Sequence, residues 1–235
     1  VYSAINKFKI DYVIVGPEQP LVKGIVDFLE DKKIKVFGPN KFASKLEGSK
    51  AFMKNLCEEN KIPTAEFSTF NSLDGLEEFI NNSKVPIVIK ADGLAAGKGV
   101  TICQTKNEAI LESKEILNGK FKSSQTVVIE EFLKGEELSY FVLVDQDDYI
   151  FFGSAQDHKR VGEKETGLNT GGMGAYSPAP ILNESLENKI KKKIIEPTLQ
   201  GLKKLGGTYK GILYAGLIIC EGEPFLIEYN IRMGD

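Results

Sequence analysis

Two lysines and a cluster of glycines between residues 86 and 103 have the spacing of a phosphate-binding flap. An apolar, β-branched run ends at Lys90, and a second such run begins at Val100. The loop between them contains Gly93, Gly97, Lys98 and Gly99. Glycine lets backbone N–H groups approach an anion without interference from a Cβ atom, and lysine supplies charge for phosphate oxygens. We therefore predict a strand, an anion-binding glycine loop and a returning strand. The simpler alternative is an ordinary tight hairpin.

Neither of the two best-known phosphate motifs fits this loop. A Walker A loop needs four residues between its glycines and Ser or Thr after its lysine. Here Gly93 and Gly97 enclose three residues, and Gly99 follows Lys98. The dinucleotide fingerprint is excluded because Ile102 occupies the position of its third glycine. Since a strand follows the loop, a bound phosphate would lie under a hairpin flap.

A second candidate site is the polar side of the last predicted strand, at residues 224–232. Glu228, Asn230 and Arg232 alternate along it and therefore share one face of a sheet. The residues expected on the other face are Ile227, Tyr229 and Ile231. A carboxylate and an amide oxygen near phosphates suit a hard cation such as Mg²⁺. A solvent-exposed polar sheet face is the alternative interpretation.

Arginine is rare in this chain, which uses lysine almost everywhere. Only Arg160 and Arg232 stand among the 30 cationic residues, and each lies close to an aspartate, Asp157 or Asp235. Guanidinium offers a planar fork for carboxylate or phosphate that an ammonium group cannot copy. The lone histidine, His158, lies beside Asp157. We predict functional roles at these positions, with lysine-rich codon usage as the alternative explanation.

Two pairs of adjacent glutamates flank the segment that joins the two halves of the chain. Glu130 and Glu131 lie in a strand predicted to leave the first half, and Glu136 and Glu137 precede the next strand. Strand alternation predicts that one member of each pair points inward. We interpret the pairs as candidate adenine and ribose contacts, although solvation at the surface is the usual explanation of such acids.

The composition is that of a globular protein with enough chain for one or two cores. The 235 residues are 42% hydrophobic and 27% charged, with a net charge of −3. This balance favours neither nucleic acid nor a membrane as a partner, and no apolar run reaches the ~18–20 residues of a membrane span. The first residues do not resemble a signal peptide. Cys57, Cys103 and Cys220 are widely spaced in apolar surroundings, which predicts reduced core residues of a cytoplasmic protein.

The first part of the chain has the pattern of a βαβ unit, with strands at 12–15 and 34–37 around a helix at 21–29. Such a unit implies parallel strands. The residues that follow the first strand are Gly16, Pro17 and Glu18. They lie at the edge where open α/β sheets bind ligands, although a plain strand-to-helix turn explains them equally well. Two strands are few for a stable sheet, so we expect an earlier portion of this domain to precede Val1.

Three further segments are predicted from capping residues and periodicity. Ser49 is a plausible N-cap of a helix with Lys50 in its first turn, where the cation is either exposed or recruited to an anion. Residues 161–180 show no helical or strand period, which is typical of a ligand-binding loop. A helix over residues 184–205 is expected to kink at Pro197.

Seven short motifs occur in order: Gly16–Glu18, Leu46–Lys50, Ile89–Gly99, Val128–Phe132, Gln156–Arg160, Asn169–Pro178 and Ile227–Asn230. Together they closely resemble the phosphoribosylamine–glycine ligase family of the ATP-grasp superfamily, over nearly the whole chain. The motifs around Asp157 and Asn169 are specific to this family within the superfamily. The resemblance implies a fold of α/β and α+β class, in which the two α+β lobes of an ATP-grasp fold follow a partial Rossmann-like domain.

The resemblance also divides the chain. It implies a partial Rossmann-like domain at 1–48, a linking helix at 49–62, a small lobe with the glycine-rich flap at 63–131, and a large, C-terminally truncated lobe at 132–235. Family members begin with a glycine-rich strand and loop and continue into a further domain, neither of which is present here. We therefore expect an internal fragment that binds ATP without efficient turnover.

The activity implied for the intact protein is that of an ATP-dependent carboxylate–amine ligase. It would join glycine to 5-phosphoribosylamine through a glycyl phosphate, giving glycinamide ribonucleotide, ADP and phosphate in purine biosynthesis. The implied cofactors are ATP and Mg²⁺ or Mn²⁺, with neither nucleic acid nor a membrane as a partner. Two alternatives are an ATP-grasp ligase for another small carboxylate and a nucleotide-binding module without catalysis.

The resemblance assigns site residues one motif at a time. Nucleotide contacts are implied for Lys50, Lys90, Gly93, Gly97, Lys98, Gly99, Glu130, Glu131, Phe132, Leu133 and Glu137, and metal contacts for Glu228 and Asn230. Substrate contacts are implied for Gly16, Pro17, Glu18, Asp157, Arg160, Asn169, Thr170, Gly171 and Gly172. Catalytic roles are implied for Asp157, Lys159 and Arg232, where Arg232 would hold an oxyanion and Asp157 the ammonium group of glycine.

Overall fold

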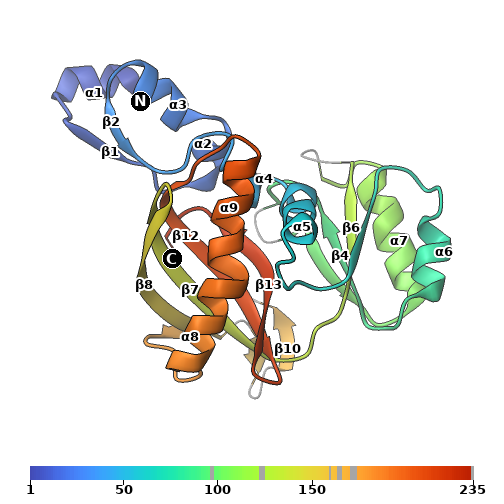
Figure 1. Cartoon of the computed structure of the whole chain (residues 1–235). Coiled ribbons are helices and arrows are strands. Elements are labelled where there is room, and N and C mark those ends of the chain that lie inside the picture. Colours follow the sequence, from blue (N-terminus) through green and yellow to red (C-terminus); the bar gives the residue numbers. More distant parts are fainter. Residues whose placement is uncertain (96–97, 122–124, 159, 163–165, 170–173, 234–235) are drawn as a thin grey trace.

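A computed structural model describes the chain except for residues 96–97, 122–124, 159, 163–165, 170–173 and 234–235 (Figure 1). For residues 160–161 and 166–169 it describes the backbone alone. Within the described residues the strands form a two-stranded parallel sheet, a four-stranded sheet, a five-stranded sheet and a short two-stranded ribbon. Figure 1 shows the parallel sheet at one end of the molecule and the two larger sheets side by side.

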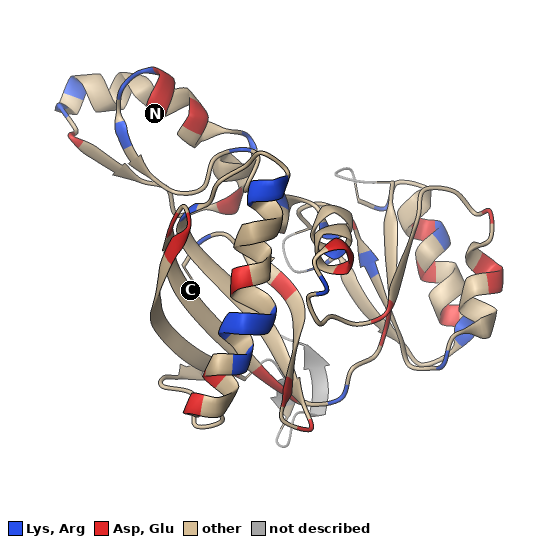
Figure 2. Cartoon of the chain, viewed as in Figure 1, with Lys and Arg blue, Asp and Glu red and all other residues tan. Residues whose placement is uncertain are grey.

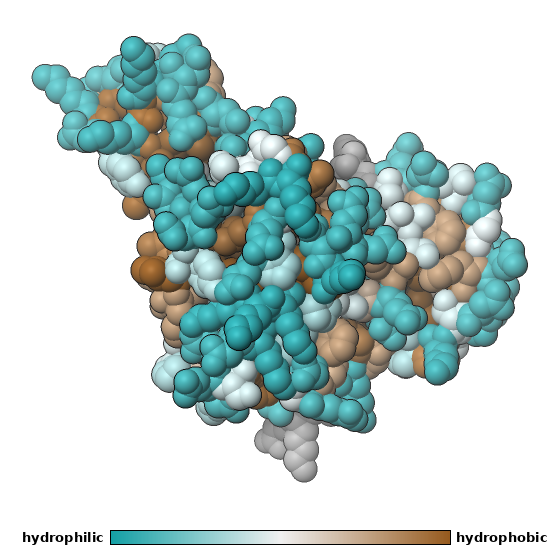
Figure 3. Space-filling model, viewed as in Figure 1, coloured by the Kyte–Doolittle hydropathy of each residue, from teal (hydrophilic) through white to brown (hydrophobic). Residues whose placement is uncertain are grey.

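The N-terminal part, up to β2, contains the predicted βαβ unit. Its elements are α1 (Tyr2–Phe8), β1 (Tyr12–Ile14), α2 (Glu18–Val22), α3 (Ile25–Asp31) and β2 (Lys35–Phe37). The parallel pairing of β1 with β2 is confirmed. The prediction of a single helix at 21–29 is wrong, because Gly24 adopts a φ of +87° and separates α2 from α3. Tyr12 and Ile14 on β1 remain 50% and 65% exposed, and Figure 3 shows apolar surface on this part of the molecule.

The small lobe is the four-stranded antiparallel sheet with two helices on one face. Its elements are β3 (Phe67–Phe70), α6 (Leu76–Asn82), β4 (Ile87–Ala91), β5 (Val100–Cys103), α7 (Lys106–Leu117) and β6 (Val127–Glu131). The predicted hairpin of β4 and β5 is confirmed. The strand order is β3-β6-β4-β5, so β6 lies inside this sheet and does not leave it as predicted. The reason is that Val127, Val128 and Ile129 are buried and β6 bonds to a strand on each side.

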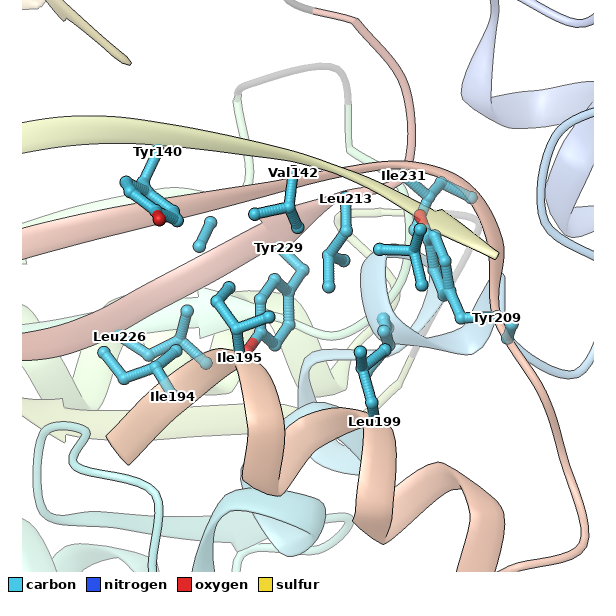
Figure 4. Packing of buried hydrophobic residues seen from close by; sticks show 14 of the residues in the cluster. Tyr140, Val142, Ile194, Ile195, Leu199, Tyr209, Leu213, Leu226, Tyr229 and Ile231 are labelled. Carbon is cyan, nitrogen blue, oxygen red and sulfur yellow. The ribbon is translucent and has the colours of Figure 1, made fainter. Parts of the chain in front are cut away.

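The large lobe is the five-stranded antiparallel sheet covered on one face by a long helical segment. Its strands are β7 (Glu136–Asp145), β8 (Asp148–Asp157), β11 (Ala175–Tyr176), β12 (Lys210–Cys220) and β13 (Glu223–Asn230), in the order β11-β8-β7-β12-β13. Figure 4 shows the core between the two layers, where Val142, Leu213 and Tyr229 from the sheet face Ile194, Ile195 and Leu199 from the helices. Alternate strand residues therefore face the helices, and the remaining ones face away from this core.

The helical segment of the large lobe is interrupted, although not by a simple proline kink. It comprises α8 (Glu184–Ile190), a π-helical turn η1 (Lys191–Ile195) and α9 (Glu196–Lys204). Proline lacks an amide proton, and its ring crowds the carbonyl group four residues earlier. The wider π turn directly before Pro197 accommodates that ring without ending the helix. The Thr198 hydroxyl then donates to the Ile194 carbonyl oxygen at 2.7 Å.

The prediction that residues 161–180 lack regular structure is wrong in part. The segment contains β9 (Arg160–Gly162) and β10 (Thr166–Asn169), which pair antiparallel, and β11 pairs with the end of β8. Strands of two to four residues are too short to show a hydrophobic period, which explains why the sequence pattern missed them.

The surface carries charges of both signs. Figure 2 shows lysines and carboxylates mixed along α7 and along the helices of the large lobe, without a single basic face in that view. Among the described residues, no helix combines the length and the apolar character that crossing a membrane requires.

Candidate nucleotide site

The first turn of α5 (Lys50–Glu59) is tied to the start of the glycine flap. The Ser49 side chain accepts from the amide of Phe52 at 3.1 Å, which confirms the predicted N-cap. The Ser49 hydroxyl also donates to Asp92 at 3.1 Å, and the Lys50 ammonium donates to the Gly93 carbonyl oxygen at 3.1 Å. Asp92 was not among the predicted site residues, although it directly follows a buried strand at the start of the glycine flap.

Lys90 points away from the helices of the small lobe and is almost completely buried. Its ammonium lies 2.9 Å from one oxygen of Glu130 and donates to the Ile227 carbonyl oxygen of β13 at 3.4 Å. This second contact crosses from the small lobe to the large lobe. Because Glu228 follows Ile227, the ammonium of Lys90 and the carboxylate of Glu228 belong to neighbouring parts of the two lobes.

The charge of Glu228 also acts on Lys50, the second lysine of the site. Burial lowers the pKa of the Lys50 ammonium, whereas the nearby Glu228 carboxylate acts to raise it. Two ammonium groups and a carboxylate thus converge between the lobes. Such a mixed set of charges can hold a polyphosphate and a divalent cation together.

The acidic pair on β6 divides as predicted, with Glu130 4% exposed and Glu131 exposed. Both oxygens of Glu130 face lysines, because the second lies 3.0 Å from the ammonium of Lys54. Glu131 instead accepts from the Glu66 amide at 3.0 Å. Glu130 therefore acts as a counter-ion for the lysines, a role that differs from the adenine contact expected from the sequence.

The other acidic pair does not follow the same pattern, and the predicted inward placement of one member is wrong. Glu136 and Glu137 are both exposed at the start of β7. Glu137 nevertheless lines a small pocket together with Ser139, Tyr214 and Glu228. The pocket lies on the sheet face opposite the helices, because Tyr140 and Val142 pack in the core with the helices, whereas Ser139 occupies the alternate position of β7.

The flap itself is described in part. Gly97 lies outside the described residues, whereas Lys98 is exposed and Gly99 is buried. A Cβ atom at Gly99 would lie 2.6 Å from the Cβ atom of Ala95, so the close return of the loop requires glycine there. Gly93 has a φ of +82°, which also favours glycine.

The polar alternation at the end of β13 is confirmed for four of the six residues named. Tyr229 and Ile231 are buried, whereas the side chains of Glu228 and Asn230 are partly exposed. The prediction that Ile227 lies on the sheet face opposite Glu228 is wrong. A bulge shifts the pairing of β12 with β13 at this point, and Ile227 lines the same pocket as Glu228. The sixth residue, Arg232, is partly exposed just after the strand ends.

The protein groups near this pocket can hold a hard cation only if phosphates and water supply the remaining ligands. No group of three or more His, Cys, Asp or Glu side chains suited to a metal occurs in the described part of the chain. Glu228 and Asn230 offer a carboxylate and an amide oxygen, which are ligands that Mg²⁺ accepts. Mg²⁺ commonly keeps several water molecules and takes substrate phosphates as further ligands, so two protein donors suffice.

Arg232 joins the end of β13 to the N-terminal part of the chain. Its Nε atom lies 3.2 Å from Glu18 and 3.7 Å from Glu47 of α4 (Lys45–Gly48). Glu47 also accepts from the Ile231 amide at 2.8 Å. The structure thus brings Glu18 and Arg232 together as candidate site residues. Glu47 was missed as a site residue, although it stands within the Leu46–Lys50 motif.

We predict a pH effect on stability from Glu47. Burial raises its pKa from 4.5 to about 7, against the opposing effects of the Ile231 amide and Arg232. The folded protein then binds more protons than the unfolded chain between these values, so this contribution is full below pH 4.5 and is lost as the pH rises through about 7. Glu47→Gln should flatten the fall in the free energy of unfolding from pH 5 to pH 8 by up to about 3 kcal/mol.

Urea denaturation at several pH values measures this effect. Glu59→Gln, an exposed glutamate on α5, serves as the control and should leave the pH dependence as it is in the unchanged chain. Equal pH dependence in the Glu47→Gln and unchanged chains would contradict the prediction.

The predicted substrate motifs around Asp157 and Asn169 are described only in part. Asp157 ends β8, where its backbone pairs with Ala175, and the His158 ring lies 5.5 Å from the ring of Tyr176. The backbones of Arg160 and Asn169 pair with each other in the ribbon of β9 and β10. Residues outside the described part are Lys159, Thr170, Gly171 and Gly172.

The remaining predicted contacts have intermediate or high exposure. Phe132 is 39% exposed and Leu133 is partly buried, directly after β6. Two apolar residues that were not predicted as site residues, Val88 and Ile102, are paired across β4 and β5. They lie on the face of the sheet that carries Lys90, since both Val88 and Lys90 occupy alternate positions of β4. A flat aromatic base could pack against them.

Two family models match the chain. "Phosphoribosylglycinamide synthetase, N domain" matches residues 1–47, and "Phosphoribosylglycinamide synthetase, ATP-grasp (A) domain" matches residues 48–235. The phosphoribosylamine–glycine ligase of Mesorhizobium japonicum is 52% identical over an alignment of 239 positions, which covers 100% of this chain and 56% of that protein. The Escherichia coli ligase is 49% identical over 230 residues, 97% of this chain and 54% of that protein. The chain therefore spans about half the length of the curated relatives it matches.

Solved structures share the architecture. The crystal structure of the phosphoribosylamine–glycine ligase of Thermotoga maritima matches with a TM-score of 0.81 and 38% identity, over 90% of this chain and 54% of that one. The biotin carboxylase domain of Hydrogenobacter thermophilus 2-oxoglutarate carboxylase, crystallised with MgADP and bicarbonate, matches with a TM-score of 0.76. At 18% identity over 99% of this chain and 50% of that one, this second likeness shows a shared fold alone. The fold of the chain is thus an ATP-grasp fold.

Proposed function

Because the chain belongs to the phosphoribosylglycinamide synthetase family, we propose that it carries the nucleotide site of a phosphoribosylamine–glycine ligase. The intact protein would join glycine to 5-phosphoribosylamine at the expense of ATP, in purine biosynthesis. The observation that carries the proposal is the contact of Lys90 with Ile227, which brings a buried cation of the small lobe next to Glu228 of the large lobe. A site for a nucleoside triphosphate with its metal needs both groups in one place.

The phosphates of ATP would lie between the flap and the end of β13. Lys50 and Lys90 supply two ammonium groups, and the flap residues up to Gly99 supply backbone N–H groups. The adenine would pack on Val88 and Ile102, near Phe132 and Leu133. Glu137 would accept from the ribose hydroxyl groups, since it faces the same pocket as Glu228.

Glu228 and Asn230 would hold Mg²⁺, with the remaining ligands supplied by phosphates and water. When bound, the metal neutralises phosphate charge and orients the phosphate groups for attack. The carboxylate of glycine carries the same sign of charge as the phosphate that it attacks. Lysine and arginine side chains around the site therefore contribute mainly by positioning and by electrostatic stabilisation, and a protein nucleophile is not needed.

The substrates of the proposed reaction would bind beside Arg232. Its guanidinium group would stabilise the oxyanion that forms at the reacting carbon, and Glu18 and Glu47 keep this group in place. Asp157 would bind the ammonium group of glycine, with Lys159 beside it. The motif residues proposed to complete the substrate site are Gly16, Pro17, Arg160, Asn169, Thr170, Gly171 and Gly172.

The domain limits and the location of the protein are parts of the same proposal. We propose limits of 1–48, 49–62, 63–131 and 132–235 for the N-terminal domain, the linking helix, the small lobe and the large lobe. The location proposed is the cytoplasm.

Isothermal titration of the folded chain with Mg·ATP tests the nucleotide site. We expect saturable binding of one ATP per chain, and binding should require Mg²⁺ for full affinity. For the intact protein, ADP release should depend on both glycine and 5-phosphoribosylamine. A correctly folded chain without affinity for Mg·ATP would refute the nucleotide site, and ADP release supported equally by another small carboxylate would refute the substrate assignment.

A further inference from the structure

Lys54 is a lysine without any exposed side-chain surface, on the face of α5 that packs against the rest of the protein. Fully buried lysines are rare, because the ammonium group loses its hydration. Burial accordingly lowers the pKa of Lys54, and the Glu130 carboxylate acts to raise it. Lys54 is not one of the proposed nucleotide contacts.

All three protons of the ammonium group have an acceptor. The Nζ atom of Lys54 lies 2.7 Å from the Thr64 hydroxyl oxygen, 3.3 Å from the Ala65 carbonyl oxygen and 3.0 Å from one oxygen of Glu130. The other oxygen of Glu130 lies 2.9 Å from the ammonium group of Lys90, without the direction of a hydrogen bond. Glu130 is thus shared between one lysine that faces the proposed nucleotide and one that does not.

The same network reaches the large lobe at two adjacent residues of β13. The Thr64 hydroxyl donates to the Leu226 carbonyl oxygen at 2.6 Å, and the Leu226 amide donates to the Pro63 carbonyl oxygen at 2.8 Å. Lys90 donates to the next carbonyl oxygen, that of Ile227. Glu228 follows directly, so the network holds the β13 bulge against the small lobe.

We propose that Lys54 is a positioning residue for the nucleotide site, which keeps the positive charge of Lys90 available to phosphate by sharing the carboxylate of Glu130. The inference rests on the proposed function. With Lys54 present, two ammonium groups share one carboxylate, and a net positive charge is left at Lys90. Without Lys54, Glu130 would neutralise Lys90 completely, and the attraction of Lys90 for phosphate would fall.

Two variants separate the electrostatic role of Lys54 from a packing role: one removes only its charge, and the other also removes the charge of Glu130. Lys54→Met keeps most of the side-chain volume and removes the charge, and it should weaken ATP binding about tenfold or more, since Glu130 would then neutralise the Lys90 ammonium that attracts phosphate. AMP, which lacks the outer phosphates, should bind within about twofold of its original affinity. The double change Lys54→Met with Glu130→Gln leaves the charge of Lys90 unopposed again, so ATP binding should recover to within about threefold of the original.

Isothermal titration with Mg·ATP and with AMP measures these affinities for each chain. Met53→Ala is the matched control, because Met53 is a buried neighbour on α5 without charge. It should lower thermal stability and leave the affinity for ATP unchanged. If the single variant does not fold, the double variant carries the test, and its affinity within threefold of the original supports the proposal.

Three outcomes overturn the inference. The first is an unchanged ATP affinity in Lys54→Met, and the second is an equal loss of affinity for AMP and ATP in that variant. The third is a double variant that binds ATP as weakly as the single variant. Where the single variant is unfolded, an ATP affinity of the double variant more than threefold below the original is the third outcome. An unchanged chain that binds no ATP overturns the proposed function itself, and the inference with it. The two failures are therefore distinguishable by the titration of the unchanged chain.

Discussion

Replacing Lys90 by methionine is expected to reduce the affinity for Mg·ATP by about 100-fold, the largest effect on nucleotide binding that we predict. The ammonium of Lys90 is a buried cation at the junction of the lobes, where it contacts Glu130 and Ile227. A charge that acts in a site shielded from water contributes far more than an exposed one. The fold should survive, because Glu130 keeps its contact with Lys54 and is not left as an unpaired buried charge.

Isothermal titration measures the loss, and circular dichroism verifies the fold. The matched control is Lys114→Met, which removes a partly exposed lysine that pairs with Glu77 on the helical side of the small lobe. It should bind Mg·ATP with the original affinity, since exposed ion pairs contribute little. An affinity in Lys90→Met that equals the affinity of the control would show that the phosphates are not held at this face of the sheet.

Replacing Glu228 by glutamine should have opposite effects on ATP binding with and without metal. With Mg²⁺ present, we expect the affinity to fall by about 10-fold to 100-fold, because a carboxylate ligand is lost. With EDTA present, the affinity should be unchanged or higher, since the change removes a negative charge that lies near Lys50 and the proposed phosphates. A disturbed fold would lower the affinity under both conditions.

The control for this prediction lies on the same strand. Glu223 begins β13 and pairs with Lys189 and Lys193, at the end of the strand remote from the Lys90 contact. Glu223→Gln should leave the dependence of ATP binding on Mg²⁺ as it is in the unchanged chain. If Glu228→Gln shows the same loss with metal and with EDTA, Glu228 is not a metal ligand.

The elements that carry the site could be predicted because short-range patterns encode them. The first strand of the flap hairpin ends at Ala91, one residue after the predicted end at Lys90, and the second strand begins at Val100 as predicted. Ser49 caps α5 as its type predicts. Alternation along a strand correctly separated Glu130 from Glu131, because adjacent residues of a regular strand point to opposite faces.

The failures come from backbone irregularities and from contacts between distant segments. A bulge at Ile227 moved this residue to the face of Glu228, and no local pattern announces a bulge within an apolar strand. Gly24 divided a helix whose apolar spacing continues through the break. Glu136 and Glu137 are both exposed, because a strand end lacks a covering layer.

Ion pairs between segments that are distant in the sequence could likewise not be predicted from local patterns. Lys54 and Glu130 are 76 residues apart, and neither sequence context indicates that they meet inside the protein. Glu47 and Arg232 come together only because α4 lies beside the end of β13. Such pairs depend on the three-dimensional path of the chain, which spacing rules do not supply.

The most direct test of the central claim is a crystal structure of this chain with Mg²⁺ and a non-hydrolysable ATP analogue. We predict phosphate oxygens within hydrogen-bond distance of the Lys90 ammonium and a metal ion coordinated by the Glu228 carboxylate, in one site between the two sheets. An analogue bound elsewhere, or a metal ion that touches neither Glu228 nor Asn230, would contradict it.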